Sequence, residues 1–243
     1  MKPLRLIALL ALIPAIASAA QSPAFTVGKD NRSIAITATE KVTSEADIAT
    51  VNIGYQLFGP DKDSAYATGS KASNAIIDAL HKAGVPNDAI ESQSQSVAAA
   101  QPYLIEKLSP ADRLAHAFTI QQSWTVRSNA ADAAKILDIA VKAGANNAGQ
   151  IEWSLHDPNA AQAEAASKAL QRARSVASSM AGGLGVKLGG LIYASNEVQS
   201  EPVRPLMRAM ATDAVAAQKV QILAINPRHI ETSATVYAVF AIE

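Results

Sequence analysis

Cysteine is absent from this chain of 243 residues, so the protein can form no disulfide and has no thiol chemistry. Its fold must therefore be stabilised by an ordinary apolar core. An excess of charge of one sign is also missing, since 21 Lys and Arg residues balance 21 Asp and Glu residues. Because phosphate binding relies on clustered cations, this balance argues against a nucleic acid as a partner.

Long apolar runs are missing except near the N-terminus, where the pattern is that of an export signal. Two basic residues precede the apolar run 6–16, and Ala17-Ser18-Ala19 supplies the small residues that a signal peptidase accepts. The run is shorter than the roughly 20 residues that span a bilayer. We therefore expect a cleaved Sec-type signal peptide at residues 1–20, a single domain from 21 to 243, and a periplasmic location.

Several segments alternate apolar and polar side chains with a period of two, which is typical of half-buried strands. Alternation on one side only favours an antiparallel sheet with one covered face. We place Trp124 and Trp153 in the core on this basis. The apolar positions of the alternating segments are Ile34, Ile36, Val51, Ile53, Tyr55, Leu57, Phe118, Ile120, Trp124, Val126, Ile151, Trp153, Leu155, Val236, Ala238 and Phe240.

Three segments carry helix signals, and each lies between two predicted strands. They begin at capping residues Asp61, Asn129 and Asp157, and glycines mark their ends at 84, 144 and 182–183. The recurring strand–helix–strand order predicts repeated β-α-β units in an α+β domain, with all three helices on one face of the sheet.

A short internal repeat follows the first two helices. Residues 82–87 and 142–147 share the pattern Lys-Ala-Gly-x-x-Asn, and each copy precedes a strand. Two ordinary helix-ending turns would give the same pattern, so both interpretations stay open.

Two stretches do not alternate. Residues 98–113 contain Pro102 and Pro110 and are expected to form a long hairpin connection. Residues 200–226 carry prolines, methionines and apolar side chains, and could form a loop, a lid or an arm that contacts another subunit.

The third helix is lined with alanine. Helical spacing predicts one apolar stripe facing the core, made of Ala166, Ala169, Leu170, Ala173, Val176, Ala177, Met180 and Leu184. The helix runs into the turn Leu184-Gly185-Val186-Lys187-Leu188-Gly189. This stretch resembles the SIMPL-domain family, in which such a helix ends in a Leu-Gly-x-Lys-Leu-Gly turn. Asp47-Ile48-Ala49 and Gly144-Ala145-Asn146 are similar to further motifs of the family, although Ala46 replaces its usual proline.

The resemblance extends over residues 33–242 and implies a SIMPL-like fold. It also implies an exported envelope protein, periplasmic or peripherally associated with the outer membrane. Bacterial relatives are linked to oxidative-stress protection or are recognised as immunogenic. The matching motifs are turn and packing motifs, so the resemblance transfers no catalytic residue.

Catalytic and metal-binding motifs are missing as well. The four histidines, His81, His116, His156 and His229, have no metal-ligand spacing and are expected at the surface or at strand edges. No nucleophile elbow accompanies His156, and Asp157 is expected to cap a helix. We therefore predict no catalytic residue, no cofactor and no metal.

A glycine-rich stretch and a group of basic residues are also considered as possible ligand sites. Gly182-Gly183-Leu184-Gly185 follows a helix C-terminus, where the helix dipole repels anions, so a phosphate loop is excluded. A basic exposed face is predicted from Lys168, Arg172, Arg174 and Lys187. Such a face is usually only solvated, and the alternative is that it binds anionic lipid headgroups.

We predict a non-enzymatic envelope protein that forms a homo-oligomer. The polar side of the strand 117–127 is rich in Thr, Gln and Ser and does little to resist pairing with another chain. The first alternative is a periplasmic binding module that holds a small or lipidic ligand in the groove between sheet and helices or at residues 200–226. The second is an enzyme, which convergent ionisable groups in a pocket would identify.

Overall fold

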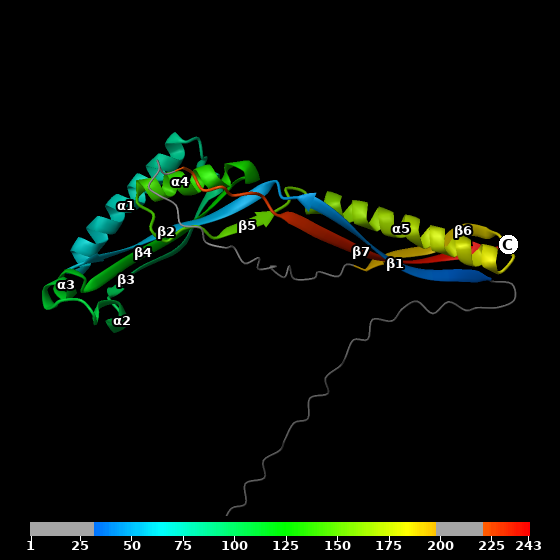
Figure 1. The fold of residues 1–243 in the computed structure, drawn as a ribbon, viewed down its shortest axis with the longest axis horizontal. Coiled ribbons are helices and arrows are strands. Elements are labelled where there is room, and N and C mark those ends of the chain that lie inside the picture. Colours follow the sequence, from blue (N-terminus) through cyan, green and yellow to red (C-terminus); the bar gives the residue numbers. More distant parts are fainter. Residues whose placement is uncertain (1–31, 198–220) are drawn as a thin grey trace, which may run out of the picture.

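The computed structural model describes residues 32–197 and 221–243, which form two antiparallel sheets placed end to end in an elongated molecule (Figure 1). Helices cover one face of each sheet. The predicted α+β class and the antiparallel pairing are confirmed. The expected signal peptide at 1–20 and positions 200–220 of the expected arm lie outside the described residues.

One half of the molecule, the four-stranded lobe, has the strand order β3-β4-β2-β5. Its elements in chain order are β2 (Ile48–Gly59), α1 (Lys62–Lys82), η1 (Asn87–Ala89), β3 (Ile90–Ala99), α2 (Pro102–Ile105), α3 (Pro110–Ala115), β4 (Phe118–Asn129), η2 (Ala130–Asp132), α4 (Ala133–Ala143) and β5 (Ile151–Ser154). They make two β-α-β units, β2-α1-β3 and β4-α4-β5, whose strands interleave in the sheet. This is the β-α-β-β-α-β arrangement of ferredoxin-like folds.

The two copies of the internal repeat lie at equivalent places in these units. One follows α1 and the other follows α4, and both place a glycine in the left-handed region, with φ of 92° at Gly84 and 119° at Gly144. The expected hairpin connection is also present, because β3 and β4 pair with each other and the short helices α2 and α3 fill the link between them.

The other half, the three-stranded lobe, has the strand order β1-β7-β6 and a single helix. Its elements are β1 (Ser33–Glu45), α5 (Pro158–Gly183), β6 (Leu188–Glu197) and β7 (His229–Ile242). We expected all three long helices on one sheet, but α1 and α4 cover the four-stranded sheet while α5 covers this one. The division arises because β1 pairs with β7, whereas β2, two residues further on, pairs with β4 and β5.

The core of the four-stranded lobe follows the predicted alternation. Ile53 and Tyr55 of β2 are 1% exposed, and Ile76 and Leu80 of α1 are fully buried against them. Trp124 of β4 is 3% exposed in the same cluster, as predicted. Trp153 is only partly buried, since it lies on the short edge strand β5.

In the three-stranded lobe the buried stripe of α5 consists of alanines alone, spaced four residues apart. They are Ala161, Ala165, Ala169, Ala173, Ala177 and Ala181. The prediction that Val176, Met180 and Leu184 face the core is wrong, because these side chains are 40%, 45% and 66% exposed. Each of the three lies one position before a position of the alanine row, or of that row extended by one turn. One residue corresponds to a rotation of roughly 100° about the helix axis, so these side chains point away from the sheet.

Candidate functional site

The residues that sequence reasoning considered for chemistry are scattered. His81 lies in the last turn of α1, His116 follows α3, His156 precedes α5 and His229 begins β7. Within residues 32–197 and 221–243, no three His, Cys, Asp or Glu side chains come together as a metal site. The absence of catalytic, cofactor and metal sites therefore stays a prediction.

Two assignments of local chemistry are confirmed. Asp157 caps α5, since its Oδ1 accepts the backbone N–H of Ala160 at 3.0 Å. The glycine-rich stretch lies at the C-terminal end of the same helix, where Gly185 has a φ of 72°. His156 donates its backbone N–H to Asp47 Oδ1 at 2.6 Å, so this region holds the β1–β2 junction against the start of α5.

The predicted basic face is partly neutralised. Arg172 bonds Glu40 of β1 at 2.9 Å, and Lys168 bonds Glu164 at 2.9 Å on α5 itself. Half of the four cations therefore already have acidic partners, which weakens the case for a lipid-headgroup surface.

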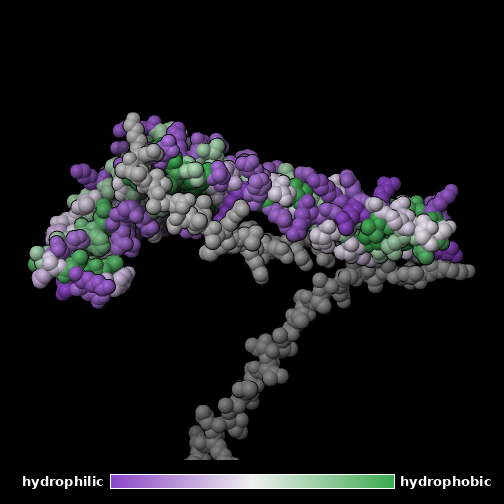
Figure 2. Space-filling model, in the orientation of Figure 1, coloured by the Kyte–Doolittle hydropathy of each residue, from purple (hydrophilic) through white to green (hydrophobic). Residues whose placement is uncertain are grey.

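Many exposed apolar side chains lie toward the two ends of the molecule (Figure 2), although Val141 of α4 and Ile222 and Leu223 before β7 are exposed as well. One group lies around the tip of the four-stranded lobe, and the other around the C-terminal part of α5 and strand β6. The first contains Tyr66, Val97, Tyr103 and Leu114, and the second Val176, Met180, Leu184, Leu191 and Ile192. Among the helices of the described ranges, none is both long and apolar enough to cross a membrane.

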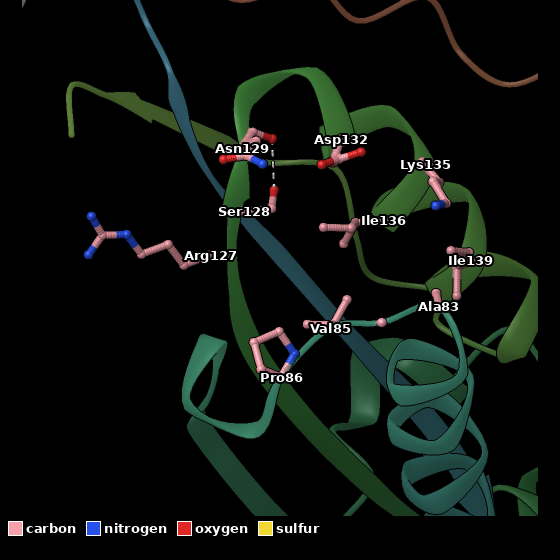
Figure 3. A pocket seen from close by; sticks show the side chains of 11 residues that line it. Ala83, Val85, Pro86, Arg127, Ser128, Asn129, Asp132, Lys135, Ile136 and Ile139 are labelled. Atoms are coloured by element: carbon pink, nitrogen blue, oxygen red, sulfur yellow. Dashed lines mark hydrogen bonds between the residues drawn. The ribbon is translucent and has the colours of Figure 1, made fainter.

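A small pocket of about 200 Å³ lies between the turn after α1 and the start of α4 (Figure 3). Val85, Pro86 and Ile136 give it an apolar lining, and Asp132 and Lys135 lie on α4 and the turn before it. Figure 3 shows the Arg127 side chain extending away from the other lining residues. The ionisable groups therefore do not converge on one point as they do in an active site.

A larger groove of about 540 Å³ lies between α1 and the outer part of the sheet, and we call it the α1–β3 groove. Its lining residues are Tyr55, Tyr66, Ser70, Ser73, Gln95, Ser96, Val97, Ile120, Gln121 and Gln122. None of them is Asp, Glu, Lys, Arg or His. A general acid or base other than tyrosine is thus missing from this groove, and its polar groups are hydroxyls and amides.

The floor of the groove has a fixed hydrogen bond. Tyr55, 1% exposed, donates its hydroxyl to Gln122 Oε1 at 3.1 Å. Burial, and to a smaller extent the neighbouring Tyr66, raises the pKa of Tyr55. The phenol therefore stays protonated and remains a donor, and the bond leaves the Gln122 amide nitrogen without a partner among the described residues.

Sequence reasoning anticipated a groove between sheet and helices but named none of its residues. They come from β2, α1, β3 and β4, which lie far apart in the chain. The one local signal is the run of Ser and Gln along β3, which is polar on both faces where a half-buried strand would alternate.

Comparison with known proteins identifies the family. The sequence matches SIMPL, described as a protein of unknown function (DUF541), over residues 34–240. The chain is 24% identical over 211 residues to the 26 kDa periplasmic immunogenic protein of Brucella melitensis biotype 1, covering 86% of this chain and 84% of the relative. The protein of that name from Brucella abortus is similar to the same extent. The chain therefore belongs to the SIMPL family.

Proposed function

We propose that this SIMPL protein is an exported, non-enzymatic protein of the cell envelope that acts by self-association. The names of its Brucella relatives, which call them periplasmic, support the location, as does the export pattern of residues 1–20. The uncharged lining of the α1–β3 groove supports a non-catalytic role. Because the chain has no cysteine, a link to oxidative stress would not act through thiol chemistry.

The observation that carries the proposal is strand β3. It forms one edge of the four-stranded sheet and, among the described residues, pairs with β4 alone. Glu91 is the one charged residue along its ten positions. Natural sheets protect their edges with charges, prolines or covering elements, and β3 has little of the first and no proline. An edge of this kind can accept a strand from a second copy.

The strand predicted from the sequence to pair with another chain, residues 117–127, has no free edge. β4, which contains most of residues 117–127, lies inside the sheet and pairs with both β2 and β3. The three-stranded sheet has two edges, β1 and β6. β1 carries Glu40, Lys41 and Glu45 and is better defended against a neighbour. β6 is as long as β3 and carries only Glu197, but irregularities in its pairing with β7 interrupt it. The polar, weakly charged surface expected from the sequence thus lies on β3 instead.

Light scattering coupled to size exclusion tests the proposal on the exported chain. We expect a multiple of the chain mass, because self-complementary surfaces usually close into symmetric oligomers. Ser94→Lys combined with Ala98→Lys places two charges on β3 and should lower that multiple. Ala67→Lys combined with Ala75→Lys adds the same charge to the exposed side of α1 and should leave it unchanged.

A wild-type monomer at micromolar concentration would reject self-association. Export has its own test, the intact mass of the protein from the cell envelope. We expect a chain that begins at Ala20 or Gln21, and a chain that retains residues 1–19 would reject the periplasmic location.

A further inference from the structure

We propose that the α1–β3 groove is a binding site for a neutral oligosaccharide. The volume of about 540 Å³ lies within the range of roughly 300–1,000 Å³ found for small-molecule sites. The ligand class follows from how the groove is shaped, which groups line it and where its exposed ring lies.

The shape of the groove results from how closely α1 packs against the sheet. Gly69 is buried in α1, and a Cβ at this position would lie 2.3 Å from Ile120 Cδ1 of β4. The helix therefore lies close against β4 at this point, over the middle of the sheet. It leaves the outer strand β3 uncovered, so Gln95 and Val97 face the space beside the helix. The side chains of the neighbouring Ser94 and Ser96 bond to β4 on the opposite face.

Several polar side chains of the groove are free to bind a ligand. Ser70 and Ser73 on α1 and Gln95 on β3 have no side-chain hydrogen bond to any residue that the structure describes. With the Gln122 amide nitrogen, they offer neutral donors and acceptors from both walls and the floor. A charged ligand would lose water here without gaining an opposite charge, whereas hydroxyl and amide groups would find partners.

The ring of Tyr66 supplies the apolar contact that a sugar needs. It projects from α1 beside the groove and is 64% exposed. The C–H-bearing face of a pyranose ring is apolar and packs against the face of an aromatic ring, while its hydroxyls point outward to polar groups. A hydroxyl-rich chain laid between Tyr66 and the amides of Gln95 and Gln122 satisfies both requirements.

The experiment uses the full exported chain and two neutral probes, cellotetraose and chitotetraose, the second of which adds acetamide groups. Saturation-transfer difference NMR detects contact and isothermal calorimetry gives the affinity. Tyr66→Ala should weaken binding about tenfold, the equivalent of roughly 1.4 kcal/mol. Tyr66→Phe keeps the ring and should retain most of the affinity. Gln95→Leu should weaken binding without loss of fold.

Tyr103→Ala is the matched control, because Tyr103 is an exposed tyrosine of α2, 70% exposed, that does not line the groove. Loss of affinity in Tyr66→Ala but not in Tyr103→Ala supports the site. No contact with either probe at millimolar concentration, or equal losses in both variants, overturns it. Tighter binding of tetragalacturonate or of a neutral Gly-Ser peptide than of the probes also overturns it. Since the readout is affinity and not particle mass, failure here leaves the self-association proposal to its own test.

Discussion

The two lobes are built on the same principle, helices on an antiparallel sheet, but with different cores. Among the described residues, seven large side chains are less than 2% exposed, and all except Val239 belong to the four-stranded lobe: Tyr55, Ile53, Ile76, Leu80, Val51 and Val126. In the three-stranded lobe the helix contributes a row of six buried alanines. The first core gains from filled volume, and the second from close approach of α5 to the sheet.

This difference predicts opposite weaknesses. A core of large side chains is damaged most when a side chain shrinks, because the surroundings collapse only in part and leave a cavity. A core of alanines is damaged most when a side chain grows, because the helix has no space in which to retreat without losing its contacts. The substitutions below separate the two cases, beginning with the largest expected effect.

The largest loss is expected for Trp124→Ala in the four-stranded lobe. The Trp124 ring is 3% exposed and lies 5.8 Å from the ring of Tyr55, centroid to centroid. We expect a decrease of about 3–5 kcal/mol in the free energy of unfolding. Trp153→Ala is the matched variant and should cost less, since Trp153 is only partly buried. Denaturant midpoints followed by circular dichroism measure both, and equal losses would contradict the assigned burial.

Overpacking should damage the three-stranded lobe. Ala173 is fully buried between α5 and the sheet, so Ala173→Leu is expected to cost about 1–3 kcal/mol. The control Ala163→Leu changes an exposed position of the same helix and should have almost no effect. Hydrogen exchange should increase in β1 and β7 and stay unchanged in β2 and β4. Equal stability of the two variants would show that the alanine row is not tightly packed.

The smallest effect concerns the start of α1. The backbone N–H of Ser64 donates to Asp61 Oδ1 at 2.7 Å, and this bond, followed by one from the Ser64 hydroxyl, lowers the pKa of Asp61. Because the pKa of Asp61 is lower in the folded than in the unfolded chain, its ionised form stabilises the folded protein at pH values above the unfolded pKa. This contribution is lost as the pH falls through the folded pKa. Asp61→Asn should keep the cap but remove its pH dependence below about pH 4. Thermal unfolding across acidic pH measures this, and parallel curves for the two proteins would count against the assignment.

Much of the local structure could be predicted because it depends on neighbours in the sequence. The alternation of Val51, Ile53 and Tyr55 identified β2, since successive side chains of a strand point to opposite faces. Asp61 and Asp157 marked the starts of α1 and α5 because a cap needs only a side chain three residues before a free N–H. The SIMPL resemblance rested on turns of the same local kind, and the match over residues 34–240 confirmed it.

The prediction of which side of α5 faces the core was partly wrong, because several rows of small and apolar residues run along this helix. The rows ending at Ala181 and at Leu184 both repeat at helical spacing, and the sequence gives no measure of which one meets the sheet. The sheet selects the alanines because they permit the closest approach. Val176, Met180 and Leu184 then remain on the exposed flank, on the side where Arg172 reaches Glu40.

The sequence by itself determined the α+β class, the β-α-β units, the caps of α1 and α5 and the family, because periodicity and turns are properties of short segments. The prediction that Asn129 caps the second long helix was wrong, because Asn129 makes no capping bond and α4 begins only after η2. The tertiary structure decided the division into two sheets, the edge position of β3 and the α1–β3 groove. Each of these depends on pairing between distant strands, such as β1 with β7, and on the seating of α1 through Gly69 against Ile120. Since a strand can pair with any suitable partner, only the assembled chain shows which edges and grooves stay open.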